Sequence, residues 1–129
     1  VNKPVLTYGK GVPVSNVSAP AGVTVSNGVP TGYTRVWITS ATGYYSARGK
    51  GSSGLGLYYG TFAVDPNVIP YGTKVYIASP DGKFVYGWAI ATDTGTAVTD
   101  GRVGVDLFYE TYTESTLNWK NEVYVYIYG

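Results

Sequence analysis

The 129-residue chain contains neither cysteine nor histidine. It therefore has no thiol nucleophile, no imidazole for acid–base catalysis, and none of the ligands on which most zinc, copper and iron sites depend. The side chains left for chemistry are those of Asp, Glu, Lys, Tyr, Ser and Thr. We accordingly expect neither a metal site nor a cofactor.

Charged residues are also scarce, at 13% of the chain, and they form no run of one sign. Nine basic and eight acidic residues give a net charge of +1, which argues against a nucleic-acid-binding stripe or a polybasic membrane patch. No apolar stretch approaches the length of a membrane span. We expect a monomer with one hydrophobic core, which neither binds nucleic acid nor inserts into a membrane.

Tyrosine and glycine are abundant instead, with 14 and 18 residues against three phenylalanines. This composition favours a β-rich protein. Tyrosines often line carbohydrate-binding grooves, because the ring stacks on a sugar while the hydroxyl forms hydrogen bonds with it. Tyrosines paired across strands on a solvated sheet face would explain the same composition.

The chain divides into an arm and a domain. Residues 1–32 are rich in Val, Pro, Ser and Gly without a helical period, which predicts an extended N-terminal arm with turns at Pro20 and at Asn27-Gly28. Residues 33–129 contain short apolar or alternating runs between turn signals, which predict a small closed β-barrel. Strands are expected at 34–47, 61–64, 74–78, 84–92, 105–108 and 122–129, and the best helix candidate is 111–120.

Three aspartates each end or follow an apolar run: Asp65 in "FAVDP", Asp93 in "AIATDTG" and Asp106 in "VGVDLF". A barrel can bring such strand ends to one mouth. Clustered carboxylates repel one another, so the pKa of at least one of them should rise. A carboxylic acid that stays protonated near neutral pH is suited to protonating a glycosidic oxygen. The three aspartates are therefore the catalytic candidates.

The aspartates also have structural explanations. Asp65 precedes a proline and suits an Asx turn, and Asp93 precedes a Thr-Gly pair, where a carboxylate can cap loop amides. Asp106 is harder to explain in this way, because a buried carboxylate must be paired or protonated. Two other sites compete: Ca²⁺ binding by the clustered aspartates, without EF-hand spacing, and a phosphate loop at "GKGSSG", without Walker spacing.

At these residues the sequence resembles the 3D domain family of bacterial cell-wall proteins, named for three aspartates. The matching motifs, over about residues 33–128, are "ATGY", "SSG", "GTFAVDPNVIPYGTKVYI", "YGWAIATDTGTA", "VDLFY" and "VYVYI". The resemblance implies a mainly all-β fold, a six-stranded double-psi β-barrel with one or two short helices, related to the catalytic part of MltA-type membrane-bound lytic transglycosylases. The chain departs from the family pattern at Gly51, Leu55, Thr96 and residues 119–122.

The resemblance also implies a chemistry. The related enzymes cleave the MurNAc–GlcNAc β-1,4 bond of peptidoglycan without water, with one acid that later acts as base. By position Asp106 corresponds to that acid/base, and Asp93 and Asp65 would tune its pKa and bind the sugar. The substrate-binding positions expected from the matching motifs are Thr42, Tyr44, Ser53, Thr94 and Gly95.

The resemblance thus predicts a lytic transglycosylase, or another muralytic domain, that acts on peptidoglycan strands as part of a secreted Gram-positive cell-wall protein. A non-catalytic glycan-binding module on the same barrel is the main alternative, and it would need no protonated carboxylic acid. A structural domain of a larger cell-surface or phage-encoded protein is a third, and its aspartates would bond only to local backbone amides.

Overall fold

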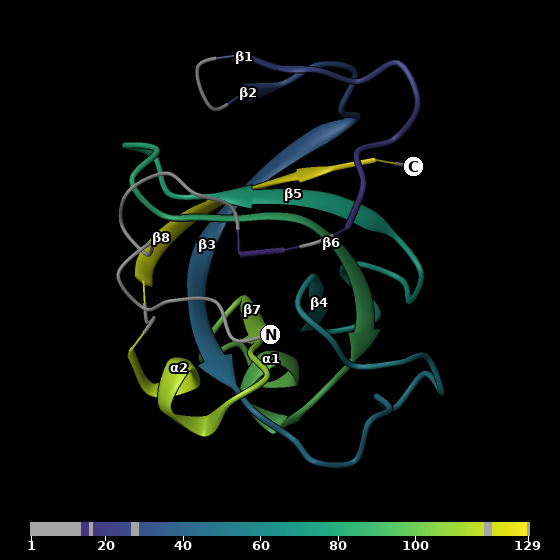
Figure 1. Ribbon diagram of the computed structural model, residues 1–129, viewed down its shortest axis with the longest axis vertical. Helices are drawn as coiled ribbons and strands as arrows, with labels where there is room; N and C mark the ends of the chain where they lie inside the picture. The colour runs from purple at the N-terminus through teal and green to yellow at the C-terminus, as the bar shows by residue number, and fades with distance from the viewer. Residues whose placement is uncertain (1–13, 16, 27–28, 118–119, 129) are drawn as a thin grey trace.

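The computed structural model describes residues 14–15, 17–26, 29–117 and 120–128, and the fold is built on a closed six-stranded β-barrel (Figure 1). The order of strands around the barrel is β3-β7-β4-β6-β5-β8. Their bounds are β3 (Arg35–Tyr44), β4 (Thr61–Ala63), β5 (Lys74–Ala78), β6 (Val85–Asp93), β7 (Val105–Phe108) and β8 (Lys120–Ile127). The prediction of a mainly β, closed-barrel fold is confirmed, and each barrel strand overlaps a strand expected from the sequence.

Two strand pairs of the barrel are parallel, β3 with β7 and β4 with β6, and the other four are antiparallel. The short strand β4 lies between β6 and β7. Its last residue, Ala63, is in register with both Asp93 on β6 and Asp106 on β7. The topology thereby brings two aspartates 13 residues apart in sequence to one end of the barrel.

The core fills the barrel with residues from alternate positions of its strands. On β8, Val123 and Val125 are fully buried, whereas Tyr124 and Tyr126 lie on the opposite face, as expected when successive side chains of a strand point to opposite sides. The core also contains three buried tyrosines, and the hydroxyl of Tyr86 donates to the Phe108 carbonyl at 2.6 Å. The polar end of Tyr86 is thus bonded to the backbone inside the core.

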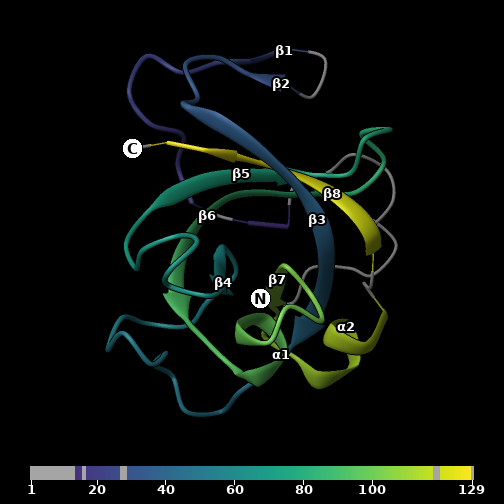
Figure 2. The same ribbon diagram turned by 180° about the vertical axis from the view of Figure 1, so that it is seen from behind.

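The described part of the N-terminal arm packs against the barrel. The amides of Val14 and Ser15 donate to the carbonyls of Val85 and Tyr86 on β6. The expected turn at Pro20 is present, because the Val23 amide donates to the Pro20 carbonyl at 3.1 Å. The arm then forms an antiparallel hairpin of β1 (Val25–Ser26) and β2 (Val29–Pro30) at one end of the molecule (Figure 2). The second expected turn, Asn27-Gly28, lies outside the described residues.

Two short helices lie at the end of the molecule opposite the hairpin (Figure 1). Helix α1 (Thr96–Thr99) follows β6, and α2 (Tyr112–Leu117) follows β7. The helix predicted at 111–120 is too long, because Lys120 already belongs to β8; residues 118–119 lie outside the described residues. The sequence did not indicate α1, since four residues are too few for a helical period. No helix of the described chain is long and apolar enough to cross a membrane.

Candidate functional site

The ends of four strands form a small cavity beside α1. It has a volume of about 240 Å³. Its lining residues are Tyr44, Arg48, Ala63, Asp93, Thr94, Gly95, Thr96, Ala97, Val98 and Asp106. Five of these, Asp93, Asp106, Tyr44, Thr94 and Gly95, were predicted as site residues from the sequence.

Asp106 is half-buried on β7, in register with Thr42 on the neighbouring β3. The Thr42 hydroxyl donates a hydrogen bond of 2.9 Å to Oδ1 of Asp106. Burial raises the pKa of the Asp106 carboxyl to about 6, the nearby Asp93 carboxylate also raises it, and the hydrogen bond from Thr42 opposes the rise. A fraction of Asp106 therefore remains protonated near neutral pH. The expected rise of one carboxyl pKa is confirmed, although burial contributes more than repulsion.

Asp93, unlike Asp106, is ionised, although it is only 1% exposed. Oδ1 accepts hydrogen bonds from the Ser52 amide, the Ser52 hydroxyl and the Thr94 amide, and Oδ2 accepts one from the Tyr44 hydroxyl at 3.1 Å. Burial favours the neutral acid, but these hydrogen bonds outweigh it and leave the pKa of Asp93 below its usual value. Asp93 is therefore a fixed anion beside Asp106.

Arg48 completes the surroundings of Asp93. Its Nη2 lies 2.9 Å from Oδ2 of Asp93, and its side chain is 59% exposed at the edge of the cavity. Burial and the Asp93 carboxylate raise the pKa of Tyr44, so the phenol stays protonated and remains a donor. The Tyr44 hydroxyl and the Arg48 guanidinium thus surround the Asp93 carboxylate. Asp106, which can carry a proton, lines the same cavity.

The glycine- and serine-rich loop 49–54 is tied to the end of β6. At Gly51 a Cβ atom would lie 2.1 Å from the Thr92 carbonyl oxygen, so the close approach of the loop requires glycine there. Ser53 donates to the Thr92 carbonyl at 2.6 Å and does not line the cavity. Its hydroxyl holds the loop, and its neighbour Ser52 bonds to Asp93.

Thr94 and Gly95 form one wall of the cavity. Within the described part of the chain, the Thr94 hydroxyl is buried without a hydrogen-bond partner. A buried hydroxyl in this condition costs free energy unless a ligand or water satisfies it. Thr94 is therefore available to a bound molecule, whereas the Thr42 hydroxyl is engaged with Asp106.

Asp65 is not in this cavity. It lines a neighbouring one of about 300 Å³ together with Trp37, Asp100 and residues of α1, and Val98 is common to both. Its Oδ1 accepts the Asn67 amide at 2.9 Å, which is the Asx turn that the sequence suggested. The groups that shift the pKa of Asp106 are Thr42 and Asp93, and Asp65 is not among them. The structure thus brings two of the three aspartates together.

Sequence reasoning missed Arg48 and Ser52, which contact Asp93 across 45 and 41 residues. Neither belongs to a pattern that points to Asp93, and the only signal was their position around the "SSG" motif. In the described ranges, no three acidic side chains lie together as a metal site would require.

The sequence matches the model of the 3D domain family over residues 60–128. It is also 42% identical to two proteins of Bacillus subtilis. These are YabE, whose name refers to cell wall shaping, over 60 residues, and the cell wall-binding protein YocH, over 57 residues. The matches cover 46% and 44% of this chain, and only 12% and 17% of those two proteins. The chain thus corresponds to a small part of each relative.

The fold is similar to that of the lytic transglycosylase MltA of Escherichia coli. The structures of an MltA variant without ligand and of MltA with bound chitohexaose both give a TM-score of 0.50 at 20% identity. The similarity covers 60% of this chain and 26% and 27% of those two chains. At this identity the comparison shows a shared barrel fold.

Proposed function

Because the chain belongs to the 3D domain family, we propose that it acts on peptidoglycan in the bacterial cell wall. The names of both Bacillus subtilis relatives, which refer to the cell wall, support this proposal. So does the glycan, chitohexaose, that is bound to MltA in a structure with the same fold. We further propose that the domain belongs to an exported protein of a Gram-positive bacterium and meets its substrate outside the cell.

The reaction we propose is lytic transglycosylation of the MurNAc–GlcNAc β-1,4 bond. The observation that supports it most is the state of Asp106, a half-buried carboxyl in a cavity with a pKa of about 6. Protonated Asp106 gives its proton to the glycosidic oxygen, and the bond between that oxygen and C1 of MurNAc breaks. The Asp106 carboxylate then takes the proton of the MurNAc C6 hydroxyl, and O6 bonds to C1 to close a 1,6-anhydro ring.

One acid suffices for this reaction, because the nucleophile is a hydroxyl of the substrate. Two-carboxylate hydrolases need a second carboxylate, which either activates a water or attacks C1 as a nucleophile. Every oxygen of Asp93 is already occupied by protein donors, which fits a role other than nucleophile. Asp93 instead supplies a fixed negative charge near the positive charge that develops at C1, and it favours the protonated form of Asp106.

The other residues of the site have positioning roles in this proposal. Thr42 orients the Asp106 carboxyl, and Tyr44 and Arg48 hold Asp93. The unpaired Thr94 hydroxyl and the adjacent Gly95 wall are where a sugar hydroxyl would bind. Asp65, in the adjoining cavity beyond Val98, would contact a different sugar unit of the same strand.

A non-catalytic wall-binding module is the second candidate. The relative named as a cell wall-binding protein favours it. The two candidates differ in what they require of Asp106. A binding module would keep its affinity whether or not that group can carry a proton.

The test is to incubate purified insoluble peptidoglycan with the chain, with Asp106→Asn, and with Glu122→Gln as a control at an exposed residue of β8 that lines neither cavity. Loss of released fragments with Asp106→Asn alone, while all three proteins still sediment with the wall, supports the lytic function. Sedimentation of all three without fragments from any would support the binding module and refute catalysis.

A further inference from the structure

A cavity larger than the Asp106 cavity lies away from Asp106, between the β1–β2 hairpin and the outer face of the barrel. Its volume is about 590 Å³, within the range typical of small-molecule sites. It is lined by Val25, Val29, Tyr76, Ala78, Ser79, Pro80, Asp81, Gly82, Val85, Tyr124 and Tyr126. None of these residues lines the Asp106 cavity. We name this cavity the tyrosine pocket.

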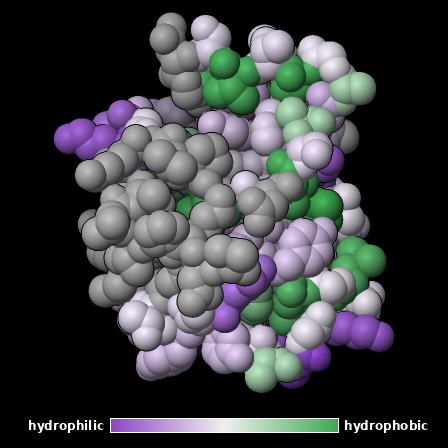
Figure 3. Space-filling model, viewed as in Figure 1, coloured by the Kyte–Doolittle hydropathy of each residue, from purple (hydrophilic) through white to green (hydrophobic). Residues whose placement is uncertain are grey.

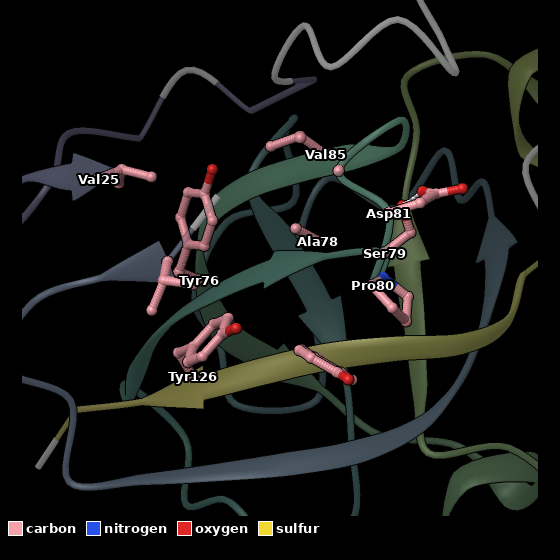
Figure 4. A pocket seen from close by; sticks show the side chains of 11 residues that line it. Val25, Tyr76, Ala78, Ser79, Pro80, Asp81, Val85 and Tyr126 are labelled. Atoms are coloured by element: carbon pink, nitrogen blue, oxygen red, sulfur yellow. Dashed lines mark hydrogen bonds between the residues drawn. The ribbon is translucent and has the colours of Figure 1, made fainter. Parts of the chain in front are cut away.

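Three tyrosines form the floor and one side of the tyrosine pocket. Tyr76 and Tyr126 come from β5 and β8, and their rings project into the space below the hairpin (Figure 4). The ring of Tyr126 lies 6.4 Å from that of Tyr76 and 6.1 Å from that of Tyr124, measured between centroids. Packing of each ring against its neighbours fixes the orientations before any ligand arrives.

The hydroxyl groups of these tyrosines are free to bind a ligand. No described residue forms a hydrogen bond with the hydroxyl of Tyr76, Tyr124 or Tyr126. By contrast, the hydroxyl of Tyr86 in the core is bonded to the backbone, and that of Tyr128 donates to the Thr31 carbonyl at 2.6 Å. The pocket therefore presents aromatic edges together with unused donors and acceptors, which is the combination that suits a sugar ring and its hydroxyls.

The charge of the lining restricts the ligand further. Asp81 is its only charged residue among those described, and no Lys or Arg lines it. Hydrogen bonds from the Ser79 hydroxyl and the Lys83 amide hold the pKa of Asp81 below its usual value, so the carboxylate is ionised. Both bonds use Oδ1, which leaves Oδ2 to accept from a ligand hydroxyl. An anionic polymer would be repelled here, whereas a neutral one would not.

The rim of the pocket consists of exposed apolar side chains on a hairpin that is anchored to the barrel. Val25 and Val29 are 40% and 44% exposed, and apolar surface is visible at the hairpin end of the molecule (Figure 3). Val23 packs against the cluster of Tyr76, Trp88 and Tyr126, and the Lys74 ammonium donates to the Ser18 carbonyl. The segment that leads into the hairpin is therefore held against the barrel, and the hairpin forms one wall of the pocket.

From these features we propose that the tyrosine pocket is a second carbohydrate site, which binds a neutral, hydroxyl-rich oligosaccharide independently of the Asp106 cavity. The two sites lie at opposite ends of β6, whose nine residues span roughly 26 Å at about 3.3 Å per residue. That distance exceeds the length of a few sugar units. The site would therefore retain the domain on a glycan while Asp106 acts elsewhere along the wall, or act as the sole anchor of a binding module.

The test uses ¹⁵N-labelled full chain carrying Asp106→Asn, so that no cleavage occurs, titrated with chitohexaose as a neutral probe and hexagalacturonate as an anionic one. The expected result is saturable shifts of the amide resonances of Tyr76, Gly82, Tyr124 and Tyr126 with chitohexaose, and none with hexagalacturonate. Tyr124→Ala should weaken this binding by roughly tenfold or more, as truncation of a central aromatic contact does. Tyr112→Ala, at a tyrosine 71% exposed and outside the pocket, should leave it unchanged.

A second variant distinguishes loss of ligand binding from loss of folding. Val29→Trp places a bulky side chain on the exposed rim without altering the barrel, and it should block the shifts while the rest of the spectrum stays native. Absence of shifts in the tyrosine pocket at millimolar chitohexaose, or equal binding of the anionic probe, would overturn the proposal. Neither result depends on lytic activity, so failure here is distinct from failure of the proposed reaction.

Discussion

Thr42 and Asp106 face each other across the parallel β3–β7 pair, and the Thr42 hydroxyl donates a 2.9 Å hydrogen bond to the Asp106 carboxyl. This bond lowers the pKa of Asp106, whereas burial raises it to about 6. Thr42 thus moderates the acid on which the proposed reaction depends. The strength of that acid is therefore set by contacts between two neighbouring strands, β3 and β7.

Replacing Thr42 with valine should therefore move the pKa of Asp106 upward from about 6, because the side chain keeps its shape and loses its donor. The upper limb of the pH–activity profile should move in the same direction. The measurement is a ¹³C NMR titration of the Asp106 carboxyl. Thr34→Val, which removes a hydroxyl bonded to the Ile127 carbonyl elsewhere on the barrel, is the matched control. A pKa that falls in Thr42→Val would contradict the role assigned to this bond.

Asp106→Asn should stabilise the fold at neutral pH. The folded-state pKa of Asp106, about 6, lies above the ordinary value of 3.8. Folding therefore favours the protonated form, and the associated stability is complete below pH 3.8 and is lost as the pH rises through 6. Asparagine keeps an acceptor for Thr42 without a charge. Its gain at pH 7.5 is up to roughly 3 kcal/mol, from about two pKa units at 1.36 kcal/mol each.

Thermal unfolding of both proteins at pH 3.5 and pH 7.5 measures this difference. The two melting temperatures should nearly coincide at the lower pH and separate at the higher one. Asp81→Asn provides a control of opposite sign, since the pKa of Asp81 is lowered and its carboxylate favours the folded state. A wild-type chain that is more stable than Asp106→Asn at pH 7.5 would show that Asp106 is ionised and paired in the folded protein.

Asp93→Asn should have the reverse effect and destabilise the fold. Oδ1 and Oδ2 of Asp93 accept hydrogen bonds from Ser52, Thr94, Tyr44 and Arg48, and an amide would present an NH₂ group to some of these donors. The expected cost is about 2–4 kcal/mol in the free energy of unfolding, in the range found when a buried charged network loses one member. The pKa of Asp93 is lowered, so the loss should shrink as the pH falls toward its folded value.

Urea unfolding at pH 7 provides the measurement, with Asp100→Asn as the control. Asp100 forms an exposed ion pair with Arg102 at 2.8 Å, and such pairs contribute less than about 1 kcal/mol. Equal effects of the two substitutions would mean that Asp93 does not hold loop 49–54 in place.

The sequence predicted the barrel strands because their signal is local. The alternation of Val and Tyr in β8 predicts which side chains point into the barrel. The burial of Val123 and Val125 confirms that prediction. The positions of Asp93 and Asp106 at strand ends were also visible. That the two aspartates lie close together could be predicted because a closed barrel brings strand ends to one mouth.

The network around Asp93 could not be predicted in the same way. Arg48 and Ser52 reach it from a loop whose sequence looks like a flexible Gly/Ser linker, and the contact depends on how loop 49–54 packs on Thr92. Asp65 could not be assigned from the sequence for another reason. Its position before a proline is compatible both with an Asx turn and with a catalytic cluster. The turn is present, and Asp65 lines a separate cavity.

Gly51→Ala should loosen loop 49–54. A Cβ at Gly51 would meet the Thr92 carbonyl oxygen at 2.1 Å, so the loop must move and the Ser52 donors must leave Asp93. A loss of about 1–3 kcal/mol is typical of such overpacking. Gly56→Ala is the control, since a Cβ there meets nothing closer than 3.7 Å. Thermal unfolding of the two variants measures the difference, and a stable Gly51→Ala would mean that the loop tolerates displacement.

The most direct test of the proposed reaction is the mass of the muropeptides released from purified peptidoglycan in ¹⁸O-labelled water. Transfer to the C6 hydroxyl through Asp106 predicts 1,6-anhydro products without ¹⁸O, one water lighter than hydrolysis products, and no products from Asp106→Asn. Reducing-end products that carry ¹⁸O would contradict it, because they require an activated water and a second catalytic group at the site.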